Sequence, residues 1–228
     1  MKRPRGPVIA AGRTINTCGF FSALTTHHEA YASINDKLSY EKDTLKKMNQ
    51  KGLPVPTLID MEVADAFVTE YLEGENPKDI FKDKRISLED KLTIVRKLSS
   101  SLSQIHENGF FHGASTLSNT RYSNSIGYWV DFGTIPKKGL ALDHLQAKDL
   151  NGFIYSACRN CSSNDIQKDM QIVNEILKAY AYRPVLDKLR DIQPQKISFL
   201  YAVLSRKRKP FAVENIRKEI VNILGKDL

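Results

Sequence analysis

Three side chains near the middle of the chain have the types and spacing of a catalytic site that uses a hard cation. Asn119 carries an amide oxygen, Asp131 carries a carboxylate, and His112 precedes both of them. Hard cations such as Mg²⁺ take oxygen ligands. A short loop and the end of a strand can bring Asn119 and Asp131 to the same cation. We therefore expect a cation site, in which Gly133 leaves room beside the ligand and Phe132 packs beneath it.

The segments on either side of this site have clear start and stop signals. Ser87 is a typical helix N-cap, and Gly109 is a typical helix end. Between them, apolar residues recur at steps of three and four: Leu88, Leu92, Val95, Leu98, Leu102 and Ile105. Residues 66–74 read as a buried strand that runs into a polar connector, which predicts a hinge. Along the chain the expected order is then a helix, a loop, a strand and Asp131.

The remaining elements are expected mainly from apolar spacing. We expect a strand over 29–35 with Lys37 in the turn after it, and a helix from Tyr40 to Lys51 that Gly52 stops. Later segments with helical spacing are 165–182, 185–189, 197–205 and 213–224. Residues 151–164 are the expected place for an irregular connection.

Taken together, these motifs resemble the protein-kinase-like superfamily. The segment from His112 to Asn119 has the spacing of the catalytic loop, His-x-Asp-x4-Asn, and Asp131-Phe132-Gly133 matches the metal-binding turn. Over residues 38–155 the chain is similar to small atypical kinases. These include the lipopolysaccharide core kinases of Gram-negative bacteria and the compact kinase that works beside the tRNA-threonylcarbamoyl machinery, with RIO kinases more distant.

The resemblance implies a fold and a set of site residues. The fold is α+β and two-lobed, with a reduced, mainly β N-terminal lobe and hinge over 1–74 and a helical C-terminal lobe over 75–228. ATP and Mg are the implied cofactors. His112, Asn119 and Asp131 are implied to be catalytic, and Asn119 and Asp131 are the metal ligands.

Three further roles come from the same resemblance. Glu41 organises the small lobe, and the hinge backbone around Glu70 and Leu72 meets the adenine. Asp149 has the place of an acid that opens a core helix and ties down the catalytic loop. Taken alone, Asp149 reads equally well as a solvent-facing acid near a helix N-terminus.

Two positions depart from the family pattern. Ala114 stands where the family carries its catalytic Asp, and general acid-base help is typically worth about 10²–10⁴-fold in rate. The expected strand over 29–35 contains no lysine that could hold the nucleotide phosphates. Slow phosphotransfer therefore competes with a second interpretation, a pseudokinase that binds a nucleotide or a partner protein without turnover. A third alternative is an unrelated α/β domain.

The two retained oxygen ligands lead us to favour an ATP- and Mg-dependent phosphotransferase. The sequence does not select its acceptor hydroxyl, which could belong to a lipopolysaccharide core sugar, a protein or a small metabolite. Nothing after Gly133 distinguishes between them, because Thr134 to Lys138 is a short and generic segment.

Composition adds limits and one candidate surface. The 228 residues carry a formal charge of +8, and the cluster Arg206, Lys207, Arg208 and Lys209 predicts an acidic or phosphorylated partner. No apolar run is long enough to span a bilayer. We therefore expect a cytoplasmic protein, with the inner membrane face as a peripheral location. Cys158 and Cys161 form a C-x-x-C that we interpret as incidental thiols, since only Cys18, His27 and His28 could complete a zinc site.

Overall fold

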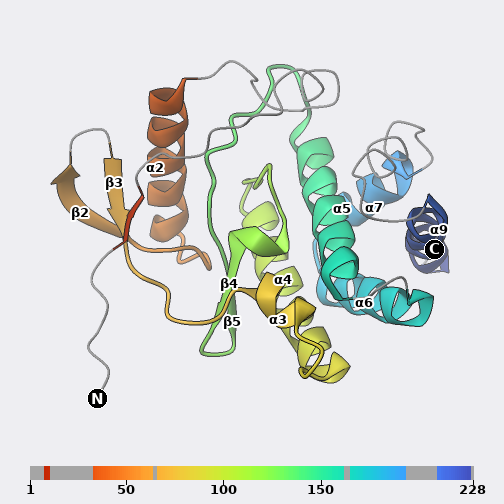
Figure 1. Cartoon of the computed structure of the whole chain (residues 1–228). Coiled ribbons are helices and arrows are strands. Elements are labelled where there is room, and N and C mark those ends of the chain that lie inside the picture. Colours follow the sequence, from red (N-terminus) through yellow and green to blue (C-terminus); the bar gives the residue numbers. More distant parts are fainter. Residues whose placement is uncertain (1–7, 11–32, 64–65, 162–164, 194–209, 227–228) are drawn as a thin grey trace.

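The computed structural model describes residues 8–10, 33–63, 66–161, 165–193 and 210–226. Within these ranges a small antiparallel sheet with one helix lies on one side of the molecule, and a group of helices makes up the other side (Figure 1). A two-stranded hairpin lies between them. The expected strand residues 29–32, the helix over 197–205 and the basic cluster at 206–209 lie outside the described residues.

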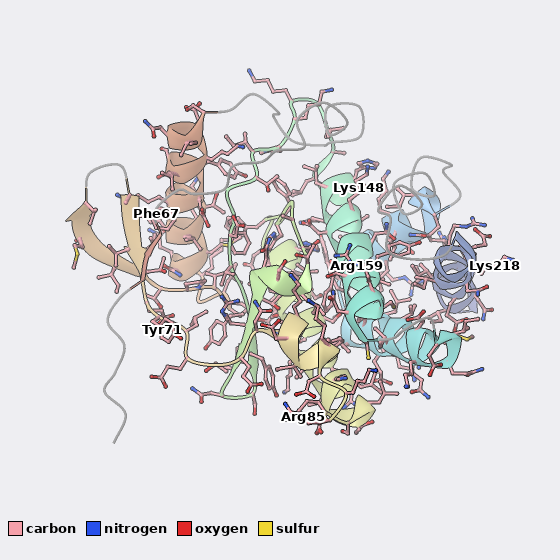
Figure 2. All side chains as sticks on the ribbon, viewed as in Figure 1. Phe67, Tyr71, Arg85, Lys148, Arg159 and Lys218 are labelled. Carbon is pink, nitrogen blue, oxygen red and sulfur yellow. The ribbon has the colours of Figure 1, made fainter. Side chains whose placement is uncertain are left out.

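The small sheet contains three strands in the order β1-β3-β2. They are β1 (Val8–Ala10), β2 (Leu58–Val63) and β3 (Ala66–Thr69), and both pairings are antiparallel. Phe67 on β3 is 3% exposed and belongs to the same core cluster as Leu45 and Met48 of the neighbouring helix (Figure 2). The strand predicted at 66–69 is confirmed, whereas no sequence signal had predicted β2.

The helix beside this sheet, α2 (Ile34–Gln50), begins six residues earlier than expected. Ser33 is its N-cap: the Ser33 hydroxyl accepts from the Asp36 amide at 3.1 Å, and the Asp36 carboxylate accepts from the Ser33 amide at 3.0 Å. This reciprocal capping box fixes the start of the helix. The strand expected through residue 35 is therefore wrong at 33–35. Lys37 lies in the first turns of α2 and not in a loop.

The connector after β3 leads into two helices. They are α3 (Pro77–Lys82), capped by Asn76, and α4 (Leu88–Glu107). The predicted cap of α4 is confirmed, since the Ser87 hydroxyl accepts from the Asp90 amide at 3.1 Å. After α4, Gly109 has φ +84°, a left-handed conformation that glycine adopts readily. The apolar face of α4 is fully buried at Val95, Leu98, Leu102 and Ile105.

A short loop and a hairpin follow α4. The loop contains the 3₁₀ turn η1 (Leu117–Asn119), and the hairpin consists of β4 (Thr120–Ser123) and β5 (Ile126–Trp129). Trp129, the single tryptophan of the chain, is fully buried, and its indole N–H donates to the Leu98 carbonyl at 3.1 Å. This contact packs the hairpin against α4, so that the segment after Trp129 emerges at a fixed place.

Four further helices complete the described chain: α5 (Leu142–Cys161), α6 (Ile166–Ala179), α7 (Arg183–Ile192) and α9 (Pro210–Lys226). The irregular connection expected at 151–164 is wrong over 151–161, because α5 continues to Cys161. Its buried residues Phe153, Ile154, Ala157 and Cys158 continue one helical face into the core. Residues 162–164 lie outside the described ranges.

The fold class is confirmed. The structure is α+β with few short strands and mostly helices, consistent with a kinase-like fold that has a small β N-terminal lobe. The division into 1–74 and 75–228 stays a prediction. In the described part of the chain, no helix has the length and apolar character needed to cross a bilayer.

Candidate functional site

The loop that carries His112 is held by a buried carboxylate on α5. Asp149 is 3% exposed; its Oδ2 accepts from the His112 amide at 2.5 Å and its Oδ1 from the Gly113 amide at 2.8 Å. Hydrogen bonds from N–H groups to a carboxylate are stronger than those between neutral groups. The interpretation of Asp149 as the acid that ties down the loop is confirmed, and the solvent-facing alternative is wrong. Asp149 lies within α5 and not at the start of this helix, where it was expected.

A second polar residue of α5 holds the far end of the same loop. The Ser156 hydroxyl accepts from the Leu117 amide at 3.0 Å. Ser156 follows Asp149 by seven residues, about two helical turns, so both face the loop. Within the stretch expected as a loop, Ser156 is thus buried because it binds a backbone amide.

His112 is fully buried and acts as a structural centre of the loop. Its Nε2–H donates to the Val130 carbonyl at 3.0 Å, and its Nδ1 accepts from the Ala114 amide at 3.2 Å. Because Nδ1 accepts, the ring is neutral, and burial lowers the pKa of His112 accordingly. Its ring lies 4.6 Å from that of Phe132 and 5.2 Å from that of Trp129. Phe132 is therefore packed beneath the loop, as predicted.

Asn119 is oriented by the same loop. The side-chain nitrogen of Asn119 donates to the Ala114 carbonyl at 2.9 Å, and the backbone carbonyl of Asn119 accepts from the Val130 amide at 3.0 Å. Among the described residues no hydrogen bond engages its side-chain oxygen, the atom a cation would use. Asp131 directly follows Val130, is exposed, and has φ +71°. The predicted metal ligands therefore come from backbone segments that are hydrogen-bonded to each other.

Glu41 of α2 reaches the same turn. Its Oε1 accepts from the Phe132 amide at 2.9 Å. A side-chain atom at Gly133 would lie 3.4 Å from Oε2 of Glu41 and 3.8 Å from Oδ1 of Asp131, so both carboxylates face the same small space. Burial and then the Asp131 carboxylate raise the pKa of Glu41 to about 7, against the lowering effect of the Phe132 N–H.

The position of the missing base is filled by no other carboxylate of the loop. Ala114 is half-buried, and the neighbouring Ser115 hydroxyl donates to the Asp149 carbonyl at 2.6 Å. The hydroxyls of Ser118 and Thr116 lie 2.7 Å apart and bind each other. Both serines of the loop are thus used for local structure.

The two expected hinge residues, Glu70 and Leu72, differ in their hydrogen bonds. Oε1 of Glu70 accepts from the amide and the hydroxyl of Thr57, both at 2.9 Å, and the Glu70 amide donates to the Thr57 carbonyl at 2.9 Å. The Glu70 side chain therefore fixes the end of β3. No hydrogen bond within the described residues engages Leu72, and neither hinge residue is hydrogen-bonded to Asn119 or Asp131.

The end of the connector is joined to the loop that carries His112. The Asn76 amide side chain donates to the Ser118 carbonyl at 3.2 Å, and the Tyr122 amide donates to the Glu75 carbonyl at 3.3 Å. A pocket of about 370 Å³ lies beside this junction and contains none of the six predicted site residues. It is lined by Glu73, Gly74, Glu75, Ile80, Tyr122, Ser123 and Asn124.

Two buried residues near the loop were not expected to matter. His106 near the end of α4 and Tyr180 after α6 are 1% and 2% exposed, and their polar atoms meet at 2.5 Å. The available signal was a histidine inside the apolar pattern of α4. Tyr180 could not be found in this way, because it lies in the segment 165–182, for which only helical apolar spacing was noted.

The C-x-x-C motif lies on α5. The Cys158 thiol is buried and donates to the Asp169 carbonyl at 3.8 Å. Cys18, His27 and His28 lie outside the described residues. Over the described ranges no group of three or more His, Cys, Asp or Glu side chains is arranged to hold a metal ion.

Comparison with known proteins finds relatives of one kind. No protein-family model matches the chain. The chain is 27% identical over 113 residues to the KEOPS complex subunit Bud32 of Pyrococcus abyssi, covering 46% of this chain and 50% of that protein. It is 31% identical over 100 residues to the EKC/KEOPS complex subunit BUD32 of Encephalitozoon cuniculi, covering 44% and 48%.

A further relative is the "Probable serine/threonine-protein kinase BUD32 homolog" of Archaeoglobus fulgidus, 32% identical over 93 residues, which cover 41% of this chain and 43% of that protein. The chain thus has homologues among Bud32-type atypical protein kinases, at modest identity. It spans about half the length of the curated relatives it matches. The predicted resemblance to lipopolysaccharide core kinases finds no support in these three relatives.

Proposed function

We propose that this chain binds ATP with Mg²⁺ and transfers the γ-phosphate slowly to a hydroxyl group. In this proposal Asn119 and Asp131 hold the cation, and the hinge backbone around Glu70 and Leu72 meets the adenine. Phosphoryl transfer requires mainly positioning and charge neutralisation from the protein. The observation that supports the proposal is the orientation of Asn119: its side-chain nitrogen donates to the Ala114 carbonyl, and its backbone carbonyl accepts from the amide of Val130, the residue before Asp131.

A protein hydroxyl is the acceptor class that we carry forward. One relative bears the name of a serine/threonine-protein kinase, and two bear the name of KEOPS complex subunits. We further propose that this chain also assembles with a partner protein. A lipopolysaccharide sugar remains the weaker alternative, since none of these three names mentions a saccharide. The acidic or phosphorylated partner of residues 206–209 stays a prediction.

Ala114 favours one competing function, a nucleotide-binding pseudokinase. The loop offers no carboxylate at the base position, and Ser115 and Ser118 are engaged elsewhere. If the rest of the site is intact, restoring the carboxylate by Ala114→Asp should raise ATP turnover, by up to about 10²–10⁴-fold for general base catalysis. A variant that binds ATP but gains no turnover would favour the pseudokinase.

The direct test is nucleotide binding by calorimetry with and without Mg²⁺, followed by ATP turnover. We expect binding to require Mg²⁺, and Asp131→Ala to remove both binding and turnover. The matched control is Asp60→Ala, an exposed acid on β2, which should leave both unchanged. Equal binding by wild type and Asp131→Ala, or no binding by either, would overturn the proposal. Binding by wild type without any turnover would leave only the pseudokinase.

A further inference from the structure

A row of buried polar groups connects the end of α6 to the catalytic loop. The Tyr180 hydroxyl lies 2.5 Å from Nδ1 of His106, and Nε2 of His106 lies 3.4 Å from Oδ2 of Asp149. Asp149 in turn binds the amides of His112 and Gly113. The row starts on a part of the molecule remote in sequence from the loop and ends on the loop backbone.

The chemistry of the row fixes where its protons lie. Nε2 of His106 faces a carboxylate oxygen, and a bare nitrogen lone pair there would repel it, so Nε2 must carry a proton. In the neutral ring Nδ1 is then an acceptor, and the Tyr180 hydroxyl donates to it. At 3.4 Å the contact between His106 and Asp149 is longer than a normal hydrogen bond, so its effect is electrostatic. The Asp149 carboxylate and a donating Tyr180 hydroxyl thus favour the same tautomer of His106.

Tyr180 is itself held in place by α4. The Ser103 hydroxyl oxygen accepts from the Ala181 amide at 3.1 Å and from the Tyr182 amide at 3.0 Å. The Ser99 hydroxyl donates to the Ile176 carbonyl at 2.7 Å, one turn earlier on α6. These bonds fix the backbone on both sides of Tyr180. Tertiary contacts therefore orient its phenol toward His106.

The far end of the row reaches a predicted metal ligand. Asp149 fixes the amide of Gly113, and the carbonyl of the following residue, Ala114, accepts from the Asn119 side chain at 2.9 Å. A displacement of the loop at Gly113 therefore rotates the Asn119 amide. Outer-shell contacts that orient a ligand in this way commonly change activity by about 10–100-fold when removed.

We propose that Tyr180 is a positioning residue for phosphotransfer, which acts through His106 and Asp149 to hold the catalytic loop and the Asn119 amide in place. This inference rests on the proposed function. Tyr180 itself touches neither substrate nor cofactor in this account. Its effect therefore belongs to the geometry of the loop and should be visible whether or not the chain turns over ATP.

The test compares Tyr180→Phe with Tyr182→Phe, which removes the same hydroxyl two residues away and outside the row. NMR reports the two ring nitrogens of His106 and the amide protons of His112 and Gly113. In Tyr180→Phe we expect the His106 nitrogen shifts to move toward a tautomer mixture and the Gly113 amide proton to move upfield. Tyr182→Phe should leave these signals at their wild-type positions.

Kinetics supply the second readout. For Tyr180→Phe we expect kcat to fall about tenfold, while KM for ATP stays within about twofold, since the hinge is not part of the row. In a His106→Asn background, Tyr180→Phe should cause no further loss. An additional loss there would show that Tyr180 does not act through His106, and would overturn the proposal.

Failure of this inference is distinguishable from failure of the proposed function. Wild-type signals of His106 and Gly113 in a folded Tyr180→Phe variant would refute the positioning role, even if the wild type is an active kinase. Absence of turnover in the wild type would refute the proposed kinase activity, and the NMR shifts would still test the positioning role of Tyr180. If Tyr180→Phe does not fold, the wild-type spectrum decides: a protonated Nδ1 with an unprotonated Nε2 in His106 would overturn the proposal.

Discussion

The carboxylate of Glu41 should make the stability of this protein depend on pH in a direction that is unusual for an acid. Burial and the nearby Asp131 carboxylate raise the pKa of Glu41 from its ordinary value of 4.5 to about 7. In the unfolded chain Glu41 ionises near 4.5, so between pH 4.5 and 7 the folded state binds more protons than the unfolded state. Stability therefore falls as pH rises through this window, and it is constant with respect to Glu41 above it.

The magnitude follows from the two pKa values. The difference between 4.5 and about 7, at about 1.4 kcal/mol for each pH unit, gives at most about 3 kcal/mol. Glu41→Gln removes the ionisation but keeps an oxygen that can accept from the Phe132 amide. We expect this variant to be more stable than wild type by about 2–3 kcal/mol at pH 8 and by less than about 1 kcal/mol at pH 5.

Urea unfolding at pH 5 and pH 8 measures this difference. Trp129 is the single tryptophan and is fully buried, so its fluorescence reports unfolding of the region around the site. The control is Glu73→Gln, which makes the same change at an exposed glutamate of the connector and should behave like wild type at both pH values. If Glu41→Gln is no more stable than wild type at pH 8, the reasoning about burial of the Glu41 carboxylate is refuted.

Two further predictions test how the loop from His112 to Asn119 is built. Asp149→Asn should lower the free energy of unfolding by about 2–3 kcal/mol, because the charged acceptor of two backbone amides is lost; an unchanged urea midpoint would contradict this. Gly113→Ala should cost more than Gly109→Ala, although φ is +82° and +84° at these two positions. A methyl at Gly113 would lie 2.3 Å from the Thr134 side chain, whereas nothing lies within 4 Å at Gly109. We therefore expect about 1 kcal/mol at Gly109 and at least about 2–3 kcal/mol at Gly113 from urea unfolding, and equal costs would contradict the close packing.

The parts of the fold that were predicted correctly from the sequence have local causes. Ser87 and Gly109 bound α4 because capping and a left-handed φ are properties of a few adjacent residues. The loop between His112 and Asn119 was predicted from the resemblance of its motif to the kinase catalytic loop. The start of α2 also had a local signal, the Ser33 and Asp36 pair, which the predicted strand over 29–35 left out.

The parts that were missed depend on contacts between distant segments. Residues 151–161 were expected to form an irregular connection, yet α5 continues through them and Ser156 is buried there as an acceptor for the Leu117 amide. The sequence assigned Glu41 to the small lobe but gave no reason to expect its bond to the Phe132 amide, since 91 residues separate them. The contact of Tyr180 with His106, 74 residues apart, is of the same kind.

The most direct test of the central claim replaces Mg²⁺ by paramagnetic Mn²⁺ and follows the chain by NMR in the presence of ATP. A cation held between Asn119 and Asp131 must broaden the side-chain amide signal of Asn119 and the backbone amide of Phe132 first. The amide of Val221 on α9 serves as the remote reference. Selective broadening at Asn119 and Phe132 that requires ATP is the predicted result. Sharp signals at both residues at saturating Mn²⁺ and ATP would contradict the account.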